Sequence, residues 1–120
     1  MDRRQQHHRE RVSEALRLEL TTIVEGELGD PRIGLVHVTE LQMSADGKTV
    51  HVFVQTDKKD DREAQQTMKG LTAAKGYIRH ELAERLGLQR APELIFELDQ
   101  RQQYGARIEE LLGRAQKRSK

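Results

Sequence analysis

The sequence predicts an α+β domain, in which a three-stranded sheet carries its helices on one face. One observation behind this class is the pattern of apolar residues, which has helical spacing in some segments and strand-like alternation in others. These segments follow one another in the order α-β-β-α-α-β-α. A second is size, because 120 residues allow one domain with a modest core. The chain has only two Phe and two Tyr and no Trp. The core must therefore be built mainly from Leu, Val and Ile.

The first predicted element is a helix from about residue 9 to residue 28. Leu18 lies off its apolar stripe, so we expect that side chain to be exposed. The helix should end before residues 29–34, where Gly29 can take a left-handed conformation and Pro31 cannot continue a helix. The stripe itself has steps of three and four residues and consists of Val12, Leu16, Leu20, Ile23, Val24 and Leu28.

Two strands follow, at residues 35–44 and 48–56, and they are predicted to form a hairpin. The Asp-Gly pair at 46–47 between two alternating runs is a strong hairpin signal. The apolar positions change phase within the first strand, which indicates a bulge near Thr39 or Glu40.

The second half of the chain contains a second helical stripe, a third strand and a last helix. After a polar connection at 57–64, the stripe runs to residue 86 and should stop at Gly87, with Gly70 and Gly76 inside it. Leu82 and Leu86 of this stripe are expected in the core. Residues 92–98 alternate as a strand does, with Leu94, Phe96 and Leu98 on one face. The last amphipathic helix is indicated by Tyr104, Ile108, Leu111, Leu112 and Ala115.

These elements form one domain at residues 9–113, between a flexible basic arm at 1–8 and a flexible basic tail at 114–120. No apolar run approaches the roughly 20 residues that span a bilayer, and the start of the chain has no secretory pattern. The absence of cysteine excludes disulfides, thiol catalysis and cysteine-ligated zinc. We therefore expect a soluble cytoplasmic protein, monomeric and without a membrane partner.

The sequence gives little support to enzymatic chemistry. None of the common hydrolase, metalloprotease or nucleotide-binding motifs occurs, and no acid of fixed spacing completes a metal set with the histidines. We expect no catalytic residues, no metal, no cofactor and no small-molecule ligand. The acidic cluster Asp57, Asp60 and Asp61 leaves open a metal-dependent RNA nuclease, although two lysines lie between these acids.

The basic residues of the second helical segment are more informative. Residues 1–61 hold 9 Lys and Arg against 12 Asp and Glu, whereas residues 62–120 hold 12 against 8. Gly76 costs about 1 kcal/mol relative to alanine inside a helix, yet it stands beside Lys75. A kink here would leave backbone N–H groups free and let a phosphodiester approach closely. The predicted RNA contacts are Lys69, Ala74, Lys75, Gly76, Arg79, Arg85 and Arg90.

Recognition of RNA shape and backbone fits this set better than base stacking does, because aromatic residues are so few. A helix–turn–helix beside a three-stranded sheet is also the layout of KH domains, but their GxxG loop is replaced here by Ala74-Lys75-Gly76.

Over roughly residues 9–112 the chain resembles the bacterial ribosome-binding factor A family. The resemblance is carried by "RVSEALRLELTTIVEGELGDPRIGLVHVTELQMSADG", then "AAKGYIRHELAERLGLQRAPELIFELD", then "YGARIEELL". It implies a type II KH-like fold (αββααβ) with an Ala-x-Gly kink, which Ala74, Lys75 and Gly76 match. It also implies a non-enzymatic assembly factor that binds the free 30S subunit and 16S rRNA. Such a factor supports late maturation and 5′-end processing of that rRNA, especially in the cold.

A different class of function stays open on the residues alone. The amphipathic helices could dock a protein partner, with exposed Leu18 as one anchor. Salt separates the two, because binding to RNA weakens steeply as salt rises and an apolar contact does not.

Overall fold

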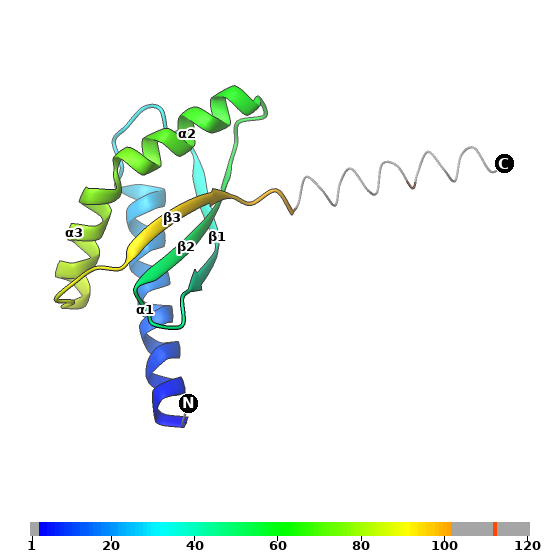
Figure 1. Cartoon of the computed structure of the whole chain (residues 1–120). Coiled ribbons are helices and arrows are strands. Elements are labelled where there is room, and N and C mark those ends of the chain that lie inside the picture. Colours follow the sequence, from blue (N-terminus) through cyan, green and yellow to red (C-terminus); the bar gives the residue numbers. More distant parts are fainter. Residues whose placement is uncertain (1–2, 102–111, 113–120) are drawn as a thin grey trace.

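Six elements follow one another in the order that the sequence predicts (Figure 1). The computed structural model describes residues 3–101 and 112. The C-terminal helix expected at 104–115 therefore lies outside the described residues except for Leu112, and the basic tail lies outside them entirely. The elements are α1 (Arg3–Gly26), β1 (Val36–Met43), β2 (Thr49–Thr56), α2 (Asp61–Ala73), α3 (Lys75–Leu86) and β3 (Glu93–Leu98).

The sheet has the order β1-β2-β3, with β1 antiparallel and β3 parallel to the central strand. The hairpin turn lies where the Asp-Gly pair predicts it, and Gly47 there has a φ of +72°. The register of β1 shifts between Val38 and Glu40, which confirms the predicted bulge. Thr39 is the extra residue, and its hydroxyl lies 2.7 Å from Oδ2 of Asp99, just beyond β3.

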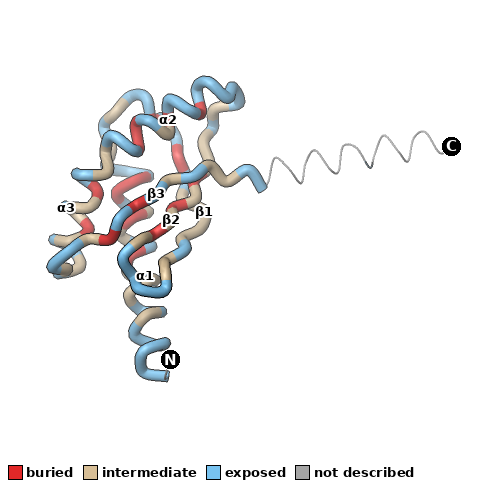
Figure 2. The backbone as a smooth tube through the Cα atoms, viewed as in Figure 1, coloured by how far each residue is buried: buried red, intermediate tan, exposed pale blue. Residues whose placement is uncertain are grey.

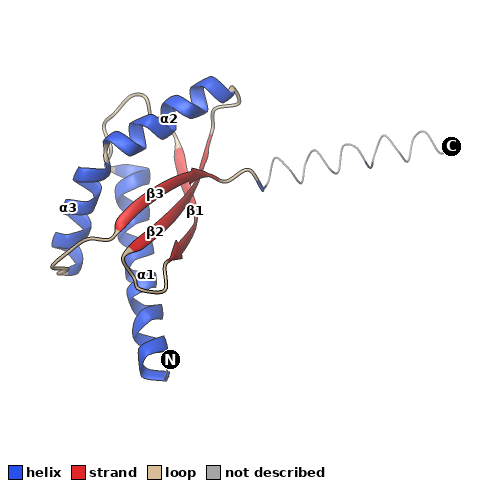
Figure 3. Cartoon of the chain, in the orientation of Figure 1, coloured by secondary structure: helices blue, strands red, loops and turns tan. Residues whose placement is uncertain are grey.

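The three helices α1, α2 and α3 of the described residues cover one face of the sheet, so the predicted α+β class is confirmed (Figure 3). Val50, Val52 and Val54 of β2 are fully buried beneath them, and Figure 2 shows the buried stretches facing one another across this single layer of packing. Leu82 of α3 is fully buried as expected, whereas Leu86, expected in the core, is only partly buried. Within the described residues, no helix is long and apolar enough to cross a membrane.

The first helix is longer at its start and shorter at its end than its apolar stripe predicts. It begins at Arg3 rather than near residue 9, so residues 3–8, expected as a flexible arm, are helical. It ends at Gly26, and Gly29 does not take the left-handed conformation expected of it. A turn closed by the Ile33 N–H on the Asp30 carbonyl (3.0 Å) follows instead.

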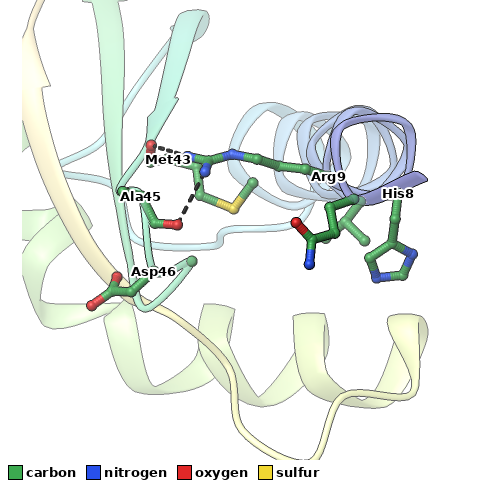
Figure 4. A pocket seen from close by; sticks show the side chains of 8 residues that line it. His8, Arg9, Met43, Ala45 and Asp46 are labelled. Carbon is green, nitrogen blue, oxygen red and sulfur yellow. Dashed lines mark hydrogen bonds between the residues drawn. The ribbon is translucent and has the colours of Figure 1, made fainter. Parts of the chain in front are cut away.

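Arg9 explains why the N-terminal part of α1 belongs to the fold. Its guanidinium donates to the backbone carbonyls of Met43, Ser44 and Ala45 at 2.8–3.1 Å. Figure 4 shows the bonds to Met43 and Ala45. These carbonyls lie at the end of β1 and in the hairpin turn, so one side chain connects the hairpin to a helix more than thirty residues away in sequence.

Leu18 of α1, predicted to lie off the apolar stripe, is 66% exposed.

The second helical segment begins and ends at defined signals. Asp60 caps α2, because its carboxylate accepts the Arg62 N–H at 2.9 Å. Gly87 ends α3 in the left-handed conformation (φ +64°), as its position predicts. Gly70 is buried within α2, and a Cβ at that position would lie only 2.8 Å from Cγ1 of Ile33. Glycine at 70 is therefore a packing requirement between α2 and the loop after α1.

Candidate nucleic-acid interface

The corner between α2 and α3 consists of a single residue, Ala74. It has φ −86° and ψ 0°, and its N–H donates to the carbonyls of Gly70 and Leu71, both at 3.1 Å. Its own carbonyl accepts the Ile78 N–H at 3.0 Å. One helix therefore passes almost directly into the next at a bend, which confirms the Ala-x-Gly corner in place of a longer loop (Figure 1).

Because alanine has no polar side chain, no side-chain hydrogen bond caps the start of α3. The first N–H groups of a helix have no intrahelical acceptor, and together with the helix dipole they favour an anion. This is a general property of helix starts, so it gains weight here only from the residues around it.

Gly76 lies in the first turn of α3 and is exposed. Its φ is not positive, and apart from its chain neighbours and the backbone of its own helix no atom lies within 4 Å of the position that a Cβ would take. Alanine would therefore fit the backbone and the space at this position and would also favour the helix. The fold does not require glycine at 76, in contrast to Gly70.

Three of the predicted contact residues have cationic side chains that stay available. Lys69 is exposed on α2, Lys75 opens α3, and Arg90 is exposed in the loop before β3. Within residues 3–101, none of the three makes a hydrogen bond or an ion pair through its side chain. Their full charges can therefore act on a ligand at the surface.

Arg79, also a predicted contact, is engaged inside the protein. Its guanidinium donates to the carbonyls of Ala91 and Pro92, both at 3.0 Å, and lies 3.7 Å from the Glu93 carboxylate. The side chain thus holds the loop before β3 against α3. The sequence, which predicts Arg79 as an RNA contact, does not reveal these internal partners.

Arg85, another predicted contact, is surrounded by three carboxylates. It pairs with Glu27 just after α1, with Glu81 one turn earlier in α3 (3.2 Å) and with Glu19 of α1 (3.6 Å). The hydrogen bond to Glu27 raises the pKa of Arg85 above its usual range. One cation among three anions leaves this end of α3 with an excess of negative charge, which does not attract phosphate.

Tyr77 is the residue at the corner that the sequence reasoning passed over. It follows Gly76 directly and is 48% exposed, although aromatic residues are scarce in this chain. The helical stripe could have identified it, because it lies off the line of Ile78 and Leu82, which face the sheet.

The described residues offer little to small ligands or metal ions. No group of three or more His, Asp or Glu side chains that could hold a metal ion occurs among them. A shallow groove of about 360 Å³ lies between α1 and the hairpin, where Arg9 crosses to the hairpin carbonyls (Figure 4). It is lined by Gln5, His8, Arg9, Val12, Met43, Ala45, Asp46 and Gly47.

Comparison with known proteins decides the family. A sequence model described as Ribosome-binding factor A matches residues 8–112. The chain belongs to the ribosome-binding factor A family. It is 57% identical to Ribosome-binding factor A of Koribacter versatilis (strain Ellin345) over 114 residues, which cover 95% of this chain and 92% of that protein.

Solved structures of the family share the fold. The crystal structure of ribosome-binding factor A from Thermus thermophilus matches with a TM-score of 0.61 and 25% identity, over 74% of this chain and 93% of that one. A homology model of the Thermus thermophilus protein, fitted into a cryo-EM map of a 30S–RbfA complex, matches with the same TM-score and identity over 74% and 92%.

Proposed function

We propose that this protein is a non-enzymatic assembly factor that binds the free 30S ribosomal subunit through 16S rRNA. Membership of the ribosome-binding factor A family carries the proposal, and a Thermus thermophilus relative has been fitted into a 30S complex. The protein acts in the cytoplasm as a monomer. It supports late maturation and 5′-end processing of 16S rRNA, above all in the cold, where RNA helices rearrange slowly.

The contact surface in this proposal is the basic corner, which we define as Lys69, Ala74, Lys75 and Gly76. Its two lysines have no partner among the described residues, and its glycine leaves open space that the fold does not need. A phosphodiester can therefore approach the backbone of α3 closely while two cations neutralise its charge. Arg90 adds a third free cation on the loop before β3.

Arg79 and Arg85, first expected to touch RNA, have other roles in the proposal. Arg79 is a positioning residue, because it holds the carbonyl of Ala91, next to Arg90, at 3.0 Å from its guanidinium. Arg85 fixes α3 to α1 through Glu19 and Glu27.

Sedimentation of a cell lysate through a sucrose gradient tests the proposal. We expect the protein in the fractions of free 30S subunits and not in those of complete ribosomes. A strain that lacks it should accumulate 16S precursor when grown in the cold. Normal 16S ends in that strain, or a protein that stays at the top of the gradient, would contradict the proposal.

A docking module for a protein partner is the second candidate, and the observation that favours it is exposed apolar side chains. Leu18 of α1 is 66% exposed and Leu35, just before β1, is 67% exposed. Apolar docking should change little between low and moderate salt, whereas binding to rRNA should weaken steeply. Loss of partner binding in Leu18→Ala, at unchanged salt dependence, would favour this candidate.

A further inference from the structure

The ring of Tyr77 lies at the surface, in the first turn of α3 next to the α2–α3 corner. Phe53 and Phe96 are each less exposed, and the Phe53 ring stacks on His51 with 6.5 Å between ring centroids. Tyr77 is 48% exposed. In the part of the chain that the structure describes, its ring has no aromatic partner and its hydroxyl makes no hydrogen bond.

The surroundings of Tyr77 match the chemistry of a nucleotide. Gly76 precedes it with open space around the absent Cβ, and Lys75 supplies a free cation two residues before the ring. The acid one turn further on, Glu81, is held 3.2 Å from Arg85 and so is turned toward the α1 side of α3, where Arg85 also pairs with Glu19 and Glu27. Residues 75–77 are consecutive in α3, so the open backbone of Gly76 lies between the side of the helix that carries the Lys75 cation and the side that carries the Tyr77 ring.

We propose that Tyr77 stacks on an unpaired nucleobase of rRNA whose phosphate lies beside Lys75 and Gly76. The inference rests on the proposed function and adds the kind of RNA that the corner takes, namely a single-stranded nucleotide with an unstacked base. Single-stranded RNA is recognised by aromatic side chains on which bases stack, together with cations along the backbone. The salt-dependent backbone contact remains the main source of affinity, and one stacked base adds to it.

Substitutions at Tyr77 distinguish the effect of the aromatic ring on 30S binding from effects of stability and of charge. Loss of one base–aromatic stack corresponds to binding that is weaker by about 5- to 150-fold, so we expect Tyr77→Leu to bind purified 30S subunits that much more weakly. Tyr77→Phe keeps the ring and should bind like the wild type. Neither change removes a charge, so the slope of log affinity against log salt should stay the same in both.

A tryptophan in place of Tyr77 reports stacking directly through its fluorescence. The chain has no Trp, so Tyr77→Trp carries a single indole that can stack in place of the phenol. Titration with 30S subunits should quench its emission, because a stacked base quenches an excited indole. The matched control is Leu18→Trp, an exposed position on α1, and its emission should change little.

The inference and the proposed function fail in different ways. If Tyr77→Leu binds 30S subunits like the wild type, or if Tyr77→Trp binds without quenching, the stacking inference is overturned. The proposed function then still stands, provided that Lys75→Gln makes the salt slope shallower. If 30S subunits do not bind the wild-type protein at all, the proposed function fails and the inference fails with it.

Discussion

The two glycines of the α2–α3 segment should respond to alanine in opposite ways. Gly70 is buried, and a new Cβ would lie 2.8 Å from Cγ1 of Ile33, a side chain that is itself only 2% exposed. Gly76 is exposed in the first turn of α3, with nothing within 4 Å of a new Cβ. We expect Gly70→Ala to destabilise the protein and Gly76→Ala to stabilise it.

The magnitudes follow from two effects. Alanine gains about 0.5–1 kcal/mol over glycine in a helix, and this gain is common to both positions. Overpacking of a filled core costs about 1–3 kcal/mol, and it applies only at Gly70. The Gly70→Ala protein should therefore be about 1–3 kcal/mol less stable than the Gly76→Ala protein. The comparison isolates the contact with Ile33, since the helical gain cancels.

Urea denaturation followed by circular dichroism in the far ultraviolet measures both stabilities. The Gly76→Ala protein should keep its fold and gain stability but bind 30S subunits more weakly, because its Cβ occupies the open space at the corner. Equal stability of the two variants would refute the packing role of Gly70. Wild-type binding of 30S by Gly76→Ala would refute the functional reason given for Gly76.

Three further predictions follow from single side chains. Leu82→Ala should cost about 2–5 kcal/mol in the free energy of unfolding, the usual range for a fully buried leucine, and an unchanged urea midpoint would contradict this. Arg79→Gln should lower the free energy of unfolding by about 1–3 kcal/mol, because two backbone carbonyls lose a charged donor. Lys75→Gln should change the free energy of unfolding by less than about 0.5 kcal/mol, and thermal denaturation measures both variants. Asp99 has its pKa held below the usual range by hydrogen bonds from Arg101 and then from Thr39, so the protein should lose stability as the pH falls below about 4. Asp99→Asn should lessen that loss. A variant whose stability depends on pH as the wild type's does would contradict the role given to Asp99.

The direction of the Asp99 effect follows from linkage. The folded protein binds the proton on this carboxylate less readily than the unfolded chain does. Stability from Asp99 is therefore complete above the ordinary carboxyl pKa of about 3.9 and is lost as the pH falls towards the lower pKa of the folded state. The Asp99 side chain is only 4% exposed, but its main partner Arg101 is 68% exposed, so solvent and salt weaken the effect.

The order of elements could be predicted from the sequence because its signals are local. Alternation, the Asp-Gly turn and the change of phase in the first strand act within a few residues of one another, and the bulge at Thr39 follows from them. The start of α1 could not be predicted in this way. Arg9 is fixed by carbonyls 34 to 36 residues away, and no local pattern announces such a partner.

The sequence could predict where in the chain the candidate site lies, but not which of its side chains are free to contact RNA. The corner lies at the Ala-x-Gly segment that the sequence indicates, but the bend is at Ala74, and Gly76, expected to mark the kink, is helical in the first turn of α3. Lys69, Lys75 and Arg90 have no side-chain partner among the described residues, and their role as RNA contacts stays a prediction. Counting charge could not reveal that Arg79 binds a loop 12 to 13 residues later, or that Arg85 meets a carboxylate 58 residues earlier. A cation counts toward an RNA surface only when the fold gives it no anion or carbonyl of its own.

The salt dependence of 30S binding tests the basic corner most directly. We propose to measure the affinity of purified 30S subunits for the wild type and for the Lys69→Gln/Lys75→Gln double variant at several salt concentrations. If each lysine neutralises one phosphate, the slope of log affinity against log salt should become shallower by roughly 1.4–1.8, at an unchanged thermal midpoint. A double variant with the wild-type slope and affinity would contradict the claim that this corner faces rRNA.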